Sequence, residues 1–416
     1  MSNDTQPEIR FPGFTDDWEE RKLKDIFDIH TDFVSNGSFQ ALKDNVKLYK
    51  TENYAYMIRL QDASNNWSGP WLYTDKQGFD FLSKSMVYKD DILMSDRGTI
   101  GKFFLVPQLD KPMTLSSNAV LLRSTKNDNN FIYYMLNTSN ISNQIIVRTT
   151  PGVQPMISKT EFKKINTRIP NIQEQQKIGS FFKQLDNTIA LHQRKLDLLK
   201  ETKKGFLQKM FPKNGAKVPE IRFPGFTEDW EQRKVFEISK VTYGGGTPKT
   251  NTKEFWKGNI PWIQSSDLEI NRLFNVSPKK KITNEAVKKS AAKIIPPNSI
   301  AIVTRVGVGK LALMPFEYAT SQDFLSLSEL QIDSYFGIFS LYSMLQKELK
   351  NIQGTSIKGM TKSDLLEKKV TIPKKYEEQQ KIGNFFKQLD DTIALHQRKL
   401  DLLKETKKGF LQKMFV

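Results

Sequence analysis

Two short segments place an arginine and a lysine on either side of a glycine turn. Arg97 and Lys102 frame one turn, and Arg305 and Lys310 frame the other, each in the pattern Arg-x-x-x-Gly-Lys. Glycine lets a backbone approach a phosphate closely, and the two cations can meet phosphate oxygens or a guanine edge. A plain surface turn with solvated charges would look the same. Because the pattern recurs, all four residues are candidate DNA contacts.

Apolar runs flank both of these turns. Ile92–Met94 and Ile300–Val303 precede them, and Phe103–Val106 and Leu311–Met314 follow them. This arrangement predicts a hairpin of two buried strands with the basic turn at its tip.

A second pair of matched segments lies earlier in each half. Tyr56–Asp62 lines up with Pro261–Asp267, and the pairing places Arg59 opposite Gln264, three residues before a shared aspartate. Both side chains can bond a base edge. They are therefore weaker candidates for direct contact with DNA bases.

The glycine turns do not fit known nucleotide-binding loops. A phosphate-binding Walker loop needs Ser or Thr after its lysine, whereas Phe103 follows Lys102 and Leu311 follows Lys310. The run Gly244–Lys249 (GGGTPK) is likewise a turn and not a dinucleotide fingerprint. The sequence also lacks a recognisable S-adenosylmethionine loop, an amino-methylation motif and a nuclease set of carboxylates with lysine.

Composition favours a polyanionic partner. The 416 residues include 63 Lys and Arg against 46 Asp and Glu, a net charge of +17, which points to nucleic acid. A membrane surface is the alternative, but no apolar run reaches spanning length and the N-terminus lacks an apolar signal core. We therefore expect a cytoplasmic protein. With no cysteine and three histidines, thiol and zinc chemistry have no support, and no metal site is expected.

Further basic and polar segments could extend the DNA surface. They are Lys279–Lys281, Lys288–Lys289 and the polar turns Thr149–Gln154 and Gly354–Lys358. A solvated face is the default interpretation of each one. Together they suggest a basic surface.

Two blocks of the chain occur twice almost letter for letter. The short repeat is Pro7–Lys22 and again Pro219–Lys234, and the long repeat is Glu174–Phe211 and again Glu378–Phe415. A period of about 200 residues is too long for a solenoid, so the chain is a duplicated half that carries two whole domains. The segments between the repeats share little identity.

The long repeat has the pattern of a helix that pairs with another helix. Its apolar residues recur with three-four spacing, and at about 1.5 Å per residue the helix would be about 57 Å long. The apolar stripe consists of Phe182, Leu185, Ile189, Leu196, Leu199, Phe206 and Met210 in the first copy, and Phe386, Leu389, Ile393, Leu400, Leu403, Phe410 and Met414 in the second. Each stripe could pack on its own domain. A rod this long overhangs such a domain, however, so we expect the two copies to form an antiparallel coiled coil.

Four polar residues fill the remaining positions of the stripes. His192 and His396 are expected to be seam residues rather than ligands or catalysts, because no carboxylate or cysteine cluster accompanies them. Lys203 and Lys407 are expected to fix the register of the helices or to meet a partner protein.

The expected fold is α+β, with two recognition domains in tandem, each followed by a long helix, and pseudo-twofold symmetry between the halves. The expected boundaries are 1–173 for the first domain with its short repeat, 174–211 for the central helix, 212–218 for a linker, 219–377 for the second domain with its short repeat, and 378–416 for the last helix.

The doubled order of these motifs resembles the specificity subunit of type I restriction-modification enzymes, over nearly the whole chain. The resemblance adds three paired signatures to the hairpin motifs: PGF-x-x-x-W (Pro12–Trp18 and Pro224–Trp230), an Ile-Pro step (Ile169-Pro170 and Ile372-Pro373) and Glu-Gln-Gln-Lys-Ile (Glu174–Ile178 and Glu378–Ile382). The GGTP turn and the stretch Trp256–Ile263 are also typical of such domains.

The resemblance implies a non-catalytic reader of double-stranded DNA. Each variable domain would read one half of an interrupted, non-palindromic target, and the helices would fix the gap. Two modification subunits that bind S-adenosylmethionine would methylate adenine at N6, and two restriction subunits would use ATP and Mg; this chain itself would bind no cofactor. A DNA-binding scaffold that recruits another machine is the main alternative, and an enzyme with unrecognised carboxylate chemistry is a third.

Overall fold

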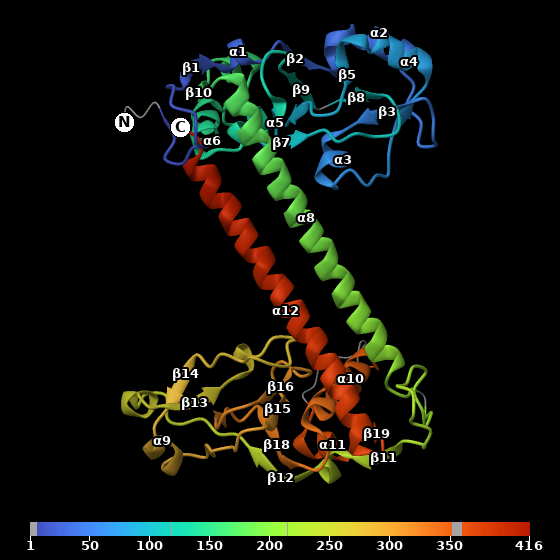
Figure 1. Ribbon diagram of the computed structural model, residues 1–416, viewed down its shortest axis with the longest axis vertical. Coiled ribbons are helices and arrows are strands. Elements are labelled where there is room, and N and C mark those ends of the chain that lie inside the picture. Colours follow the sequence, from blue (N-terminus) through green and yellow to red (C-terminus); the bar gives the residue numbers. More distant parts are fainter. Residues whose placement is uncertain (1–5, 118, 214, 352–359) are drawn as a thin grey trace. The chain divides into compact units, whose positions relative to one another are not determined.

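The computed structural model describes residues 6–117, 119–213, 215–351 and 360–416. The chain forms two compact units, unit 1 (Met1–Gln193 with Lys399–Val416) and unit 2 (Arg194–Arg398). Helix α8 (Ile172–Lys209) begins in unit 1 and ends in unit 2, and α12 (Tyr376–Lys413) begins in unit 2 and ends in unit 1 (Figure 1). Each unit therefore holds one domain and one end of both long helices. The polar turn Gly354–Lys358 lies outside the described residues.

Among its described residues, unit 1 contains two four-stranded sheets, in the orders β2-β9-β6-β7 and β4-β3-β8-β5. The strands of the first are β2 (Ile29–Asp32), β9 (Val120–Arg123), β6 (Ile92–Met94) and β7 (Phe103–Leu105). Those of the second are β4 (Tyr73–Thr74), β3 (Ala55–Ile58), β8 (Met113–Leu115) and β5 (Met86–Val87). Strands β3 and β8 are parallel, and the other neighbours are antiparallel.

The described part of unit 2 repeats this plan, with sheets β12-β18-β15-β16 and β14-β13-β17. The strands of the first are β12 (Ser239–Gly244), β18 (Phe324–Leu330), β15 (Ser299–Val303) and β16 (Leu311–Met314). Those of the second are β14 (Lys280–Ile282), β13 (Ile260–Ile263) and β17 (Ala319–Thr320), with β13 and β17 parallel. Apart from β5, which has no counterpart in the described part of unit 2, the two dissimilar sequences thus build the same topology, because both alternate buried apolar runs with turns in the same order.

A two-stranded ribbon joins the short repeat to the domain in each unit. Unit 1 pairs β1 (Glu19–Lys22) with β10 (Asn166–Ile169), and unit 2 pairs β11 (Glu231–Lys234) with β19 (Lys369–Ile372). The ribbon brings the end of the short repeat beside the strand that leads into the long helix.

Shorter helices complete the units. In unit 1 they are α1 (Leu23–Ile26), α2 (Phe39–Asn45), α3 (Leu60–Ser64), α4 (Lys76–Phe81), α5 (Asn129–Leu136), α6 (Ser139–Arg148) and α7 (Lys159–Lys163). In unit 2 they are α9 (Asn284–Lys288), α10 (Ser334–Asn351) and α11 (Lys362–Glu367), together with the 3-10 turn η5 (Ser265–Asp267). Asp128 and Asp333 cap α5 and α10 by accepting the backbone N–H of Phe131 and Phe336 at 2.7 and 2.8 Å, as N-cap carboxylates do.

Each core includes aromatic rings from both copies of the long repeat. In unit 1, Phe415 lies 5.4 Å from Phe131 and 6.2 Å from Trp18, measured between ring centroids. In unit 2, Phe211 lies 5.7 Å from Phe336 in the same stacked arrangement. Burying such a ring contributes about 1.5–3 kcal/mol, so the end of one long helix stabilises the domain that precedes the other.

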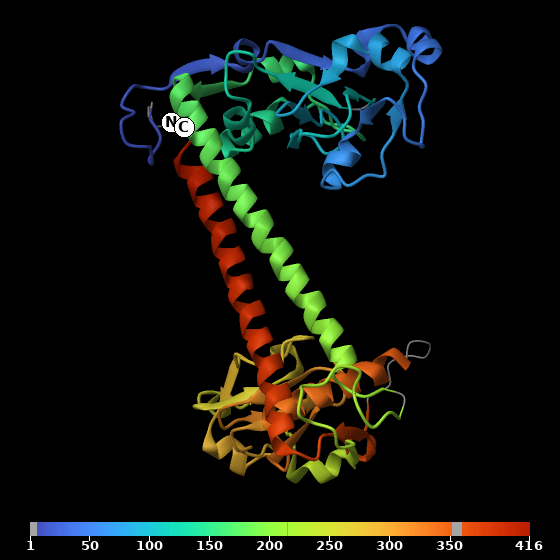
Figure 2. The same cartoon turned by 45° about the vertical axis from the view of Figure 1, so that its right-hand side comes forward.

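The two long helices run antiparallel within each unit (Figure 2). In unit 1, Phe181 of α8 contacts Phe410 of α12 (5.2 Å between ring centroids), and Asp186, further along α8, pairs with Lys407, earlier along α12. All the stripe positions named above are buried or half-buried. The expectation of an antiparallel coiled coil is therefore confirmed in each unit.

Each seam lysine forms an ion pair with an aspartate of the other long helix, which is compatible with the expectation that the lysines fix the register. Lys203 of α8 pairs with Asp390 of α12 at 2.5 Å in unit 2, and Lys407 of α12 pairs with Asp186 of α8 at 2.5 Å in unit 1. His192 and His396 are half-buried along the same stripes.

Candidate nucleic-acid interface

Both Arg-x-x-x-Gly-Lys segments lie at the tips of hairpins, as predicted. Strand β6 pairs with β7 from Ile92 opposite Leu105, and β15 pairs with β16 from Ser299 opposite Met314. All three residues of β6 and all five of β15 are buried. The strands therefore anchor the turns while the turns themselves extend toward solvent.

The glycine that precedes the lysine is required by the backbone. Gly101 and Gly309 have φ angles of +73° and +96°, in the left-handed region that other residues rarely adopt. The next carbonyl then closes each turn: that of Lys102 accepts the N–H of Ser95 at 3.0 Å, and that of Lys310 accepts the N–H of Val303 at 2.9 Å. The glycine of the shared signature is thus explained by turn geometry alone, whereas the arginine and the lysine are not.

In unit 1 the structure brings two of the candidate segments together. Gly98, within the basic turn, donates its N–H to the carbonyl of Pro155 at 3.1 Å, beside the polar turn Thr149–Gln154. Arg97 is exposed, with its Nε 3.5 Å from a carboxylate oxygen of Asp96, and Lys102 is exposed as well. This surface can meet DNA, although a neighbouring carboxylate partly offsets the charge of its arginine.

In unit 2 the hairpin is tied to the segment that carries Gln264. Lys310 Nζ donates to the carbonyl of Ser265 at 3.0 Å, so the lysine is half-buried, while Arg305 is exposed. Thr304 occupies the place that Asp96 has in unit 1 and donates its hydroxyl to the carbonyl of Asp323 at 3.0 Å.

The shared aspartate of the second motif caps a helical turn. Asp62 accepts the backbone N–H of Arg59 at 2.9 Å, and Asp267 accepts that of Gln264 at 3.0 Å. The Arg59 guanidinium also bonds Asp62 and the carbonyl of Pro70, and the hydrogen bond to Asp62 raises the pKa of Arg59. A base contact by Arg59 would have to share an already bonded group, and base contacts by Arg59 and Gln264 remain predictions.

Two basic residues near the second hairpin were missed by sequence reasoning. Lys362 opens α11, and its Nζ lies over Gly244, 2.6 Å from where a Cβ on that glycine would be. Burial lowers the pKa of Lys362, and the positive charges of Arg305 and Lys293 lower it further. The sequence signal was weak, because Lys293 and Lys362 stand alone rather than in a run.

The short and long repeats bind each other in the same way in both units. Arg10 meets Glu174 through two hydrogen bonds of 2.7 Å, and Arg222 meets Glu378 at 2.7 and 2.8 Å. Both carboxylates are buried. The end of the other long helix joins this arrangement, since Ile9 and Ile221 donate their N–H groups at 2.9 Å to the carbonyls of the helix residues Lys413 and Lys209, respectively. We call this repeated assembly of short repeat and helix ends the frame.

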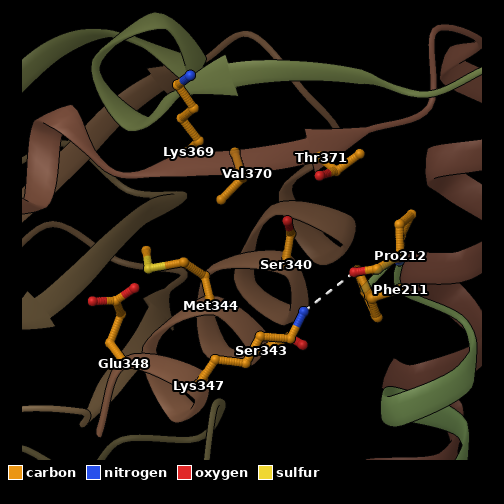
Figure 3. A pocket seen from close by; sticks show the side chains of 10 residues that line it. All are labelled: Phe211, Pro212, Ser340, Ser343, Met344, Lys347, Glu348, Lys369, Val370 and Thr371. Carbon is orange, nitrogen blue, oxygen red and sulfur yellow. Dashed lines mark hydrogen bonds between the residues drawn. The ribbon is translucent and has the colours of Figure 1, made fainter. Parts of the chain in front are cut away.

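A crevice in unit 2 lies where α8 ends against α10 and β19 (Figure 3). Lys347 points across it and donates to the carbonyl of Pro212 at 3.2 Å. The crevice has a volume of about 160 Å³, which is below the roughly 300–1,000 Å³ of a small-molecule site. The crevice is therefore better explained as a packing seam at the end of the frame.

No group of three or more His, Cys, Asp or Glu residues in the described ranges is arranged to hold a metal ion. Among the helices that the structure describes, none is long and apolar enough to cross a membrane.

Comparison with known sequences places both halves in one family. The profile of the type I restriction modification DNA specificity domain matches residues 15–201 and 227–405. A Methanocaldococcus jannaschii protein, provisionally named the MjaX type I restriction enzyme specificity subunit, is 25% identical over 95% of this chain and 92% of its own length. The Escherichia coli EcoR124I/EcoR124II specificity subunit is 48% identical over 19% of each chain.

Solved structures show the same fold. The type I restriction-modification S subunit of M. genitalium superposes with a TM-score of 0.62 at 14% identity, covering 99% of both chains. A chain from a study of complex assembly in a type I system superposes with a TM-score of 0.52 at 15% identity, covering 98% of this chain and 99% of that one. With the repeated frame, the paired hairpins and two family matches in tandem, the chain belongs to the type I restriction-modification DNA specificity family.

Proposed function

We propose that this chain reads a bipartite, interrupted and non-palindromic DNA target and directs partner subunits to methylate adenine at N6 or to restrict the DNA. Each unit would read one half of the target with its own domain. The chain would supply specificity and no catalysis.

One observation supports this proposal most strongly: the frame is the same in both units while the hairpin surfaces differ. The buried bonds of Arg10 to Glu174, both 2.7 Å long, recur between Arg222 and Glu378 at 2.7 and 2.8 Å. In the hairpins, by contrast, Asp96 beside Arg97 is replaced by Thr304 beside Arg305. A constant frame suits one kind of partner bound twice. Unlike basic hairpins suit two different half-sites, because base readout depends on the side chains that reach the groove.

The partners follow from this division. We propose two methyltransferase subunits on the two frames and two restriction subunits, with S-adenosylmethionine, ATP and Mg bound by those partners rather than by this chain. The complex would act in the cytoplasm.

A domain exchange tests the bipartite target. Methylated adenines are mapped genome-wide in cells that express the chain with its methyltransferase partner, and residues 235–377 are then replaced by the corresponding domain of another family member. Only one half of the methylated motif should change. If the whole motif changes, or if no adenine motif is methylated, the proposal is wrong.

Copurification tests the partners. A tagged chain should copurify with a methyltransferase subunit, in a ratio of two methyltransferase subunits to one copy of this chain. A single partner of a different kind would instead favour a DNA-binding scaffold.

Substitution tests the hairpin contacts. Loss of a base-reading Arg97 or Arg305 should cost about 1–3 kcal/mol of binding and relax one position of the motif, whereas loss of a phosphate-binding Lys102 or Lys310 should weaken binding to all sequences alike. The weaker candidates Arg59 and Gln264 are scored in the same way. Equal losses on cognate and random DNA for every variant would refute base reading by these residues.

A further inference from the structure

The last residue of β12 and the last residue of β2 occupy the same place in the two domains. Asp32 lies opposite Val120 in the β2–β9 pair, and Gly244 lies opposite Leu325 in the β12–β18 pair. Val120 in turn pairs with a residue of β6, and Leu325 pairs with a residue of β15. These two residues occupy the same position when the two hairpins are aligned. A carboxylate in unit 1 is thus replaced by a bare backbone in unit 2.

A lysine approaches this position in both units. Lys159 is the first residue of α7, after the capping Ser158, and Lys362 is the first residue of α11, after the capping Thr361. In unit 1 the ammonium of Lys159 pairs with Asp32 at 2.6 Å. In unit 2 the ammonium of Lys362 lies at the matching spot over Gly244, where the carboxylate is missing.

The neighbouring arginine shows the same replacement. Arg97 lies 3.5 Å from its own Asp96, whereas Arg305 follows Thr304. Unit 1 therefore supplies two carboxylates for its two cations, and unit 2 supplies neither of them.

Three cations lie in this part of unit 2: Lys362 over Gly244, Arg305 at the hairpin tip, and Lys293, which follows Ala292, whose backbone nitrogen is 2.5 Å from where a Cβ on Gly246 would be. Among the described residues, Lys362, Arg305 and Lys293 form no ion pair with a carboxylate. Arg305 and Lys293 are close enough for their charges to lower the pKa of Lys362, in addition to the larger effect of burial. Like charges repel one another, and an anion between them would remove that cost. Because Gly244 has no side chain, the ammonium of Lys362 can lie directly over its backbone.

We propose that Lys362, Arg305 and Lys293 bind a phosphate of the DNA backbone above Gly244 in unit 2, and that the ion pair of Asp32 with Lys159 closes the corresponding place in unit 1. The proposal rests on the proposed DNA-reading function. A DNA phosphate is the anion we infer because the cluster shares Arg305 with the candidate base-reading hairpin. Lysine and arginine on both sides of a phosphate would hold the hairpin in register on the duplex.

The dependence of DNA affinity on salt tests the phosphate contact. The full-length chain, with the subunit that copurifies with it, is titrated with a duplex that carries its methylated motif and with a scrambled duplex over a range of salt concentrations. Each phosphate contact contributes about 0.9 to the slope of log affinity against log salt. Lys362→Gln should therefore make this slope less steep by about one on both duplexes. The matched control Lys159→Gln should leave the slope unchanged.

A second variant guards against a change in folding. Gly244→Asp recreates the carboxylate of unit 1, and a Cβ there would press closely only on the flexible end of Lys362. It should form an ion pair with Lys362 and reduce the slope by at least one, with the melting temperature kept.

The outcomes separate the two proposals. If the unmodified chain shows no preference for the motif over the scrambled duplex, the proposed function fails. If it prefers the motif but Lys362→Gln and Gly244→Asp both keep the full salt slope, the phosphate site is refuted and the proposed function stands. A slope that falls as much in Lys159→Gln as in Lys362→Gln also refutes it, because the two units would then not differ.

Discussion

The two ends of the helix pair carry the same lysine and aspartate but surround them differently. In unit 1, Asp186 forms an ion pair with Lys407 at 2.5 Å and accepts a hydrogen bond from the hydroxyl of Tyr134 at 2.8 Å. The Lys407 ammonium also lies 5.3 Å from the centre of the Tyr134 ring. The domain thus completes an ion pair that the two helices begin.

In unit 2 the matching ring lacks the hydroxyl. The centre of the Phe339 ring lies 5.4 Å from the ammonium nitrogen of Lys203. Phe339 packs on Phe386 much as Tyr134 packs on Phe182 in unit 1. One buried carboxylate oxygen of Asp390 has no hydrogen-bond partner among the described groups. The comparison teaches that two helix ends of near-identical sequence can lie in different surroundings, because each variable domain supplies part of the environment of its own ion pair.

The largest expected effect is the loss of the buried ion pair that both units share. Glu174→Ala and Glu378→Ala each leave a partly buried arginine without its carboxylate, which should lower the free energy of unfolding by about 3–5 kcal/mol. Because the arginine contacts match in the two units, the two losses should be similar, with that of Glu378→Ala slightly larger because Glu378 also accepts the indole N–H of Trp230 at 3.3 Å. Denaturant titration of each variant measures them.

Glu201 offers the control for these variants. It is exposed and, among the residues that the structure describes, pairs only with Lys204 on the surface of the same helix, so Glu201→Ala should change stability by less than about 1 kcal/mol. A difference of more than about 2 kcal/mol between Glu174→Ala and Glu378→Ala would contradict the idea of an equivalent frame.

The next effect tests the missing hydroxyl directly. Tyr134→Phe removes the hydrogen bond to Asp186 and should lower the free energy of unfolding by about 1.5–3 kcal/mol, the usual range for a bond to a charged group. Phe339→Tyr should add the same bond to Asp390 and raise stability, though by less if the hydroxyl must shift to reach it. Opposite signs from these paired variants support the comparison, and a loss in both contradicts it.

Much of the fold could be predicted because repetition makes the pattern unambiguous. The apolar stripe from Phe182 to Met210 occurs twice, and a continuous chain leaves few ways to bury two such stripes. The hairpins were equally accessible, since buried runs on both sides of a glycine turn are a local signal. In these elements the residues that decide the structure are close together in sequence.

The details of the site depend on pairs that are far apart in sequence. Asp32 meets Lys159, and Tyr134 meets Asp186, only because the sheet and the long helix bring them together. With low identity between the domains, the strand register that makes Gly244 the counterpart of Asp32 could not be found before the fold was known. Sequence reasoning therefore identified the basic hairpins but not the charges that balance them.

A smaller effect concerns pH. Burial raises the pKa of Asp390, and the attraction of Lys203 opposes this rise. The folded protein therefore holds this proton more tightly than the unfolded chain does. Its contribution to stability is fully present below the ordinary pKa of 3.8 and is lost as pH rises through the raised pKa of the folded state. The loss is about 1.4 kcal/mol for each pH unit that separates the two pKa values.

Comparison with Asp390→Asn isolates this titration from that of the other carboxylates. As pH rises from the ordinary pKa to the raised pKa of Asp390, the free energy of unfolding of the unmodified chain should fall relative to that of the variant. At higher pH the difference between the two proteins should stay constant. In Phe339→Tyr the added hydroxyl should bring the folded pKa closer to 3.8 and narrow this pH range. A difference that does not vary with pH would contradict the uncompensated burial of Asp390.

The smallest change in stability should come from opening the place that Asp32 closes in unit 1. The Lys159–Asp32 pair is partly exposed, with 40% and 22% of the side chains accessible, so Asp32→Asn should cost less than about 1 kcal/mol. Its effect on DNA binding should be clearer, because Lys159 would then be free to meet a phosphate as Lys362 is proposed to do. The slope of log affinity against log salt should steepen by about one, the opposite of the change expected for Gly244→Asp. If the slope is unchanged, the two units place their lysines differently against DNA, and the equivalence of Asp32 and Gly244 holds for the fold but not for DNA binding.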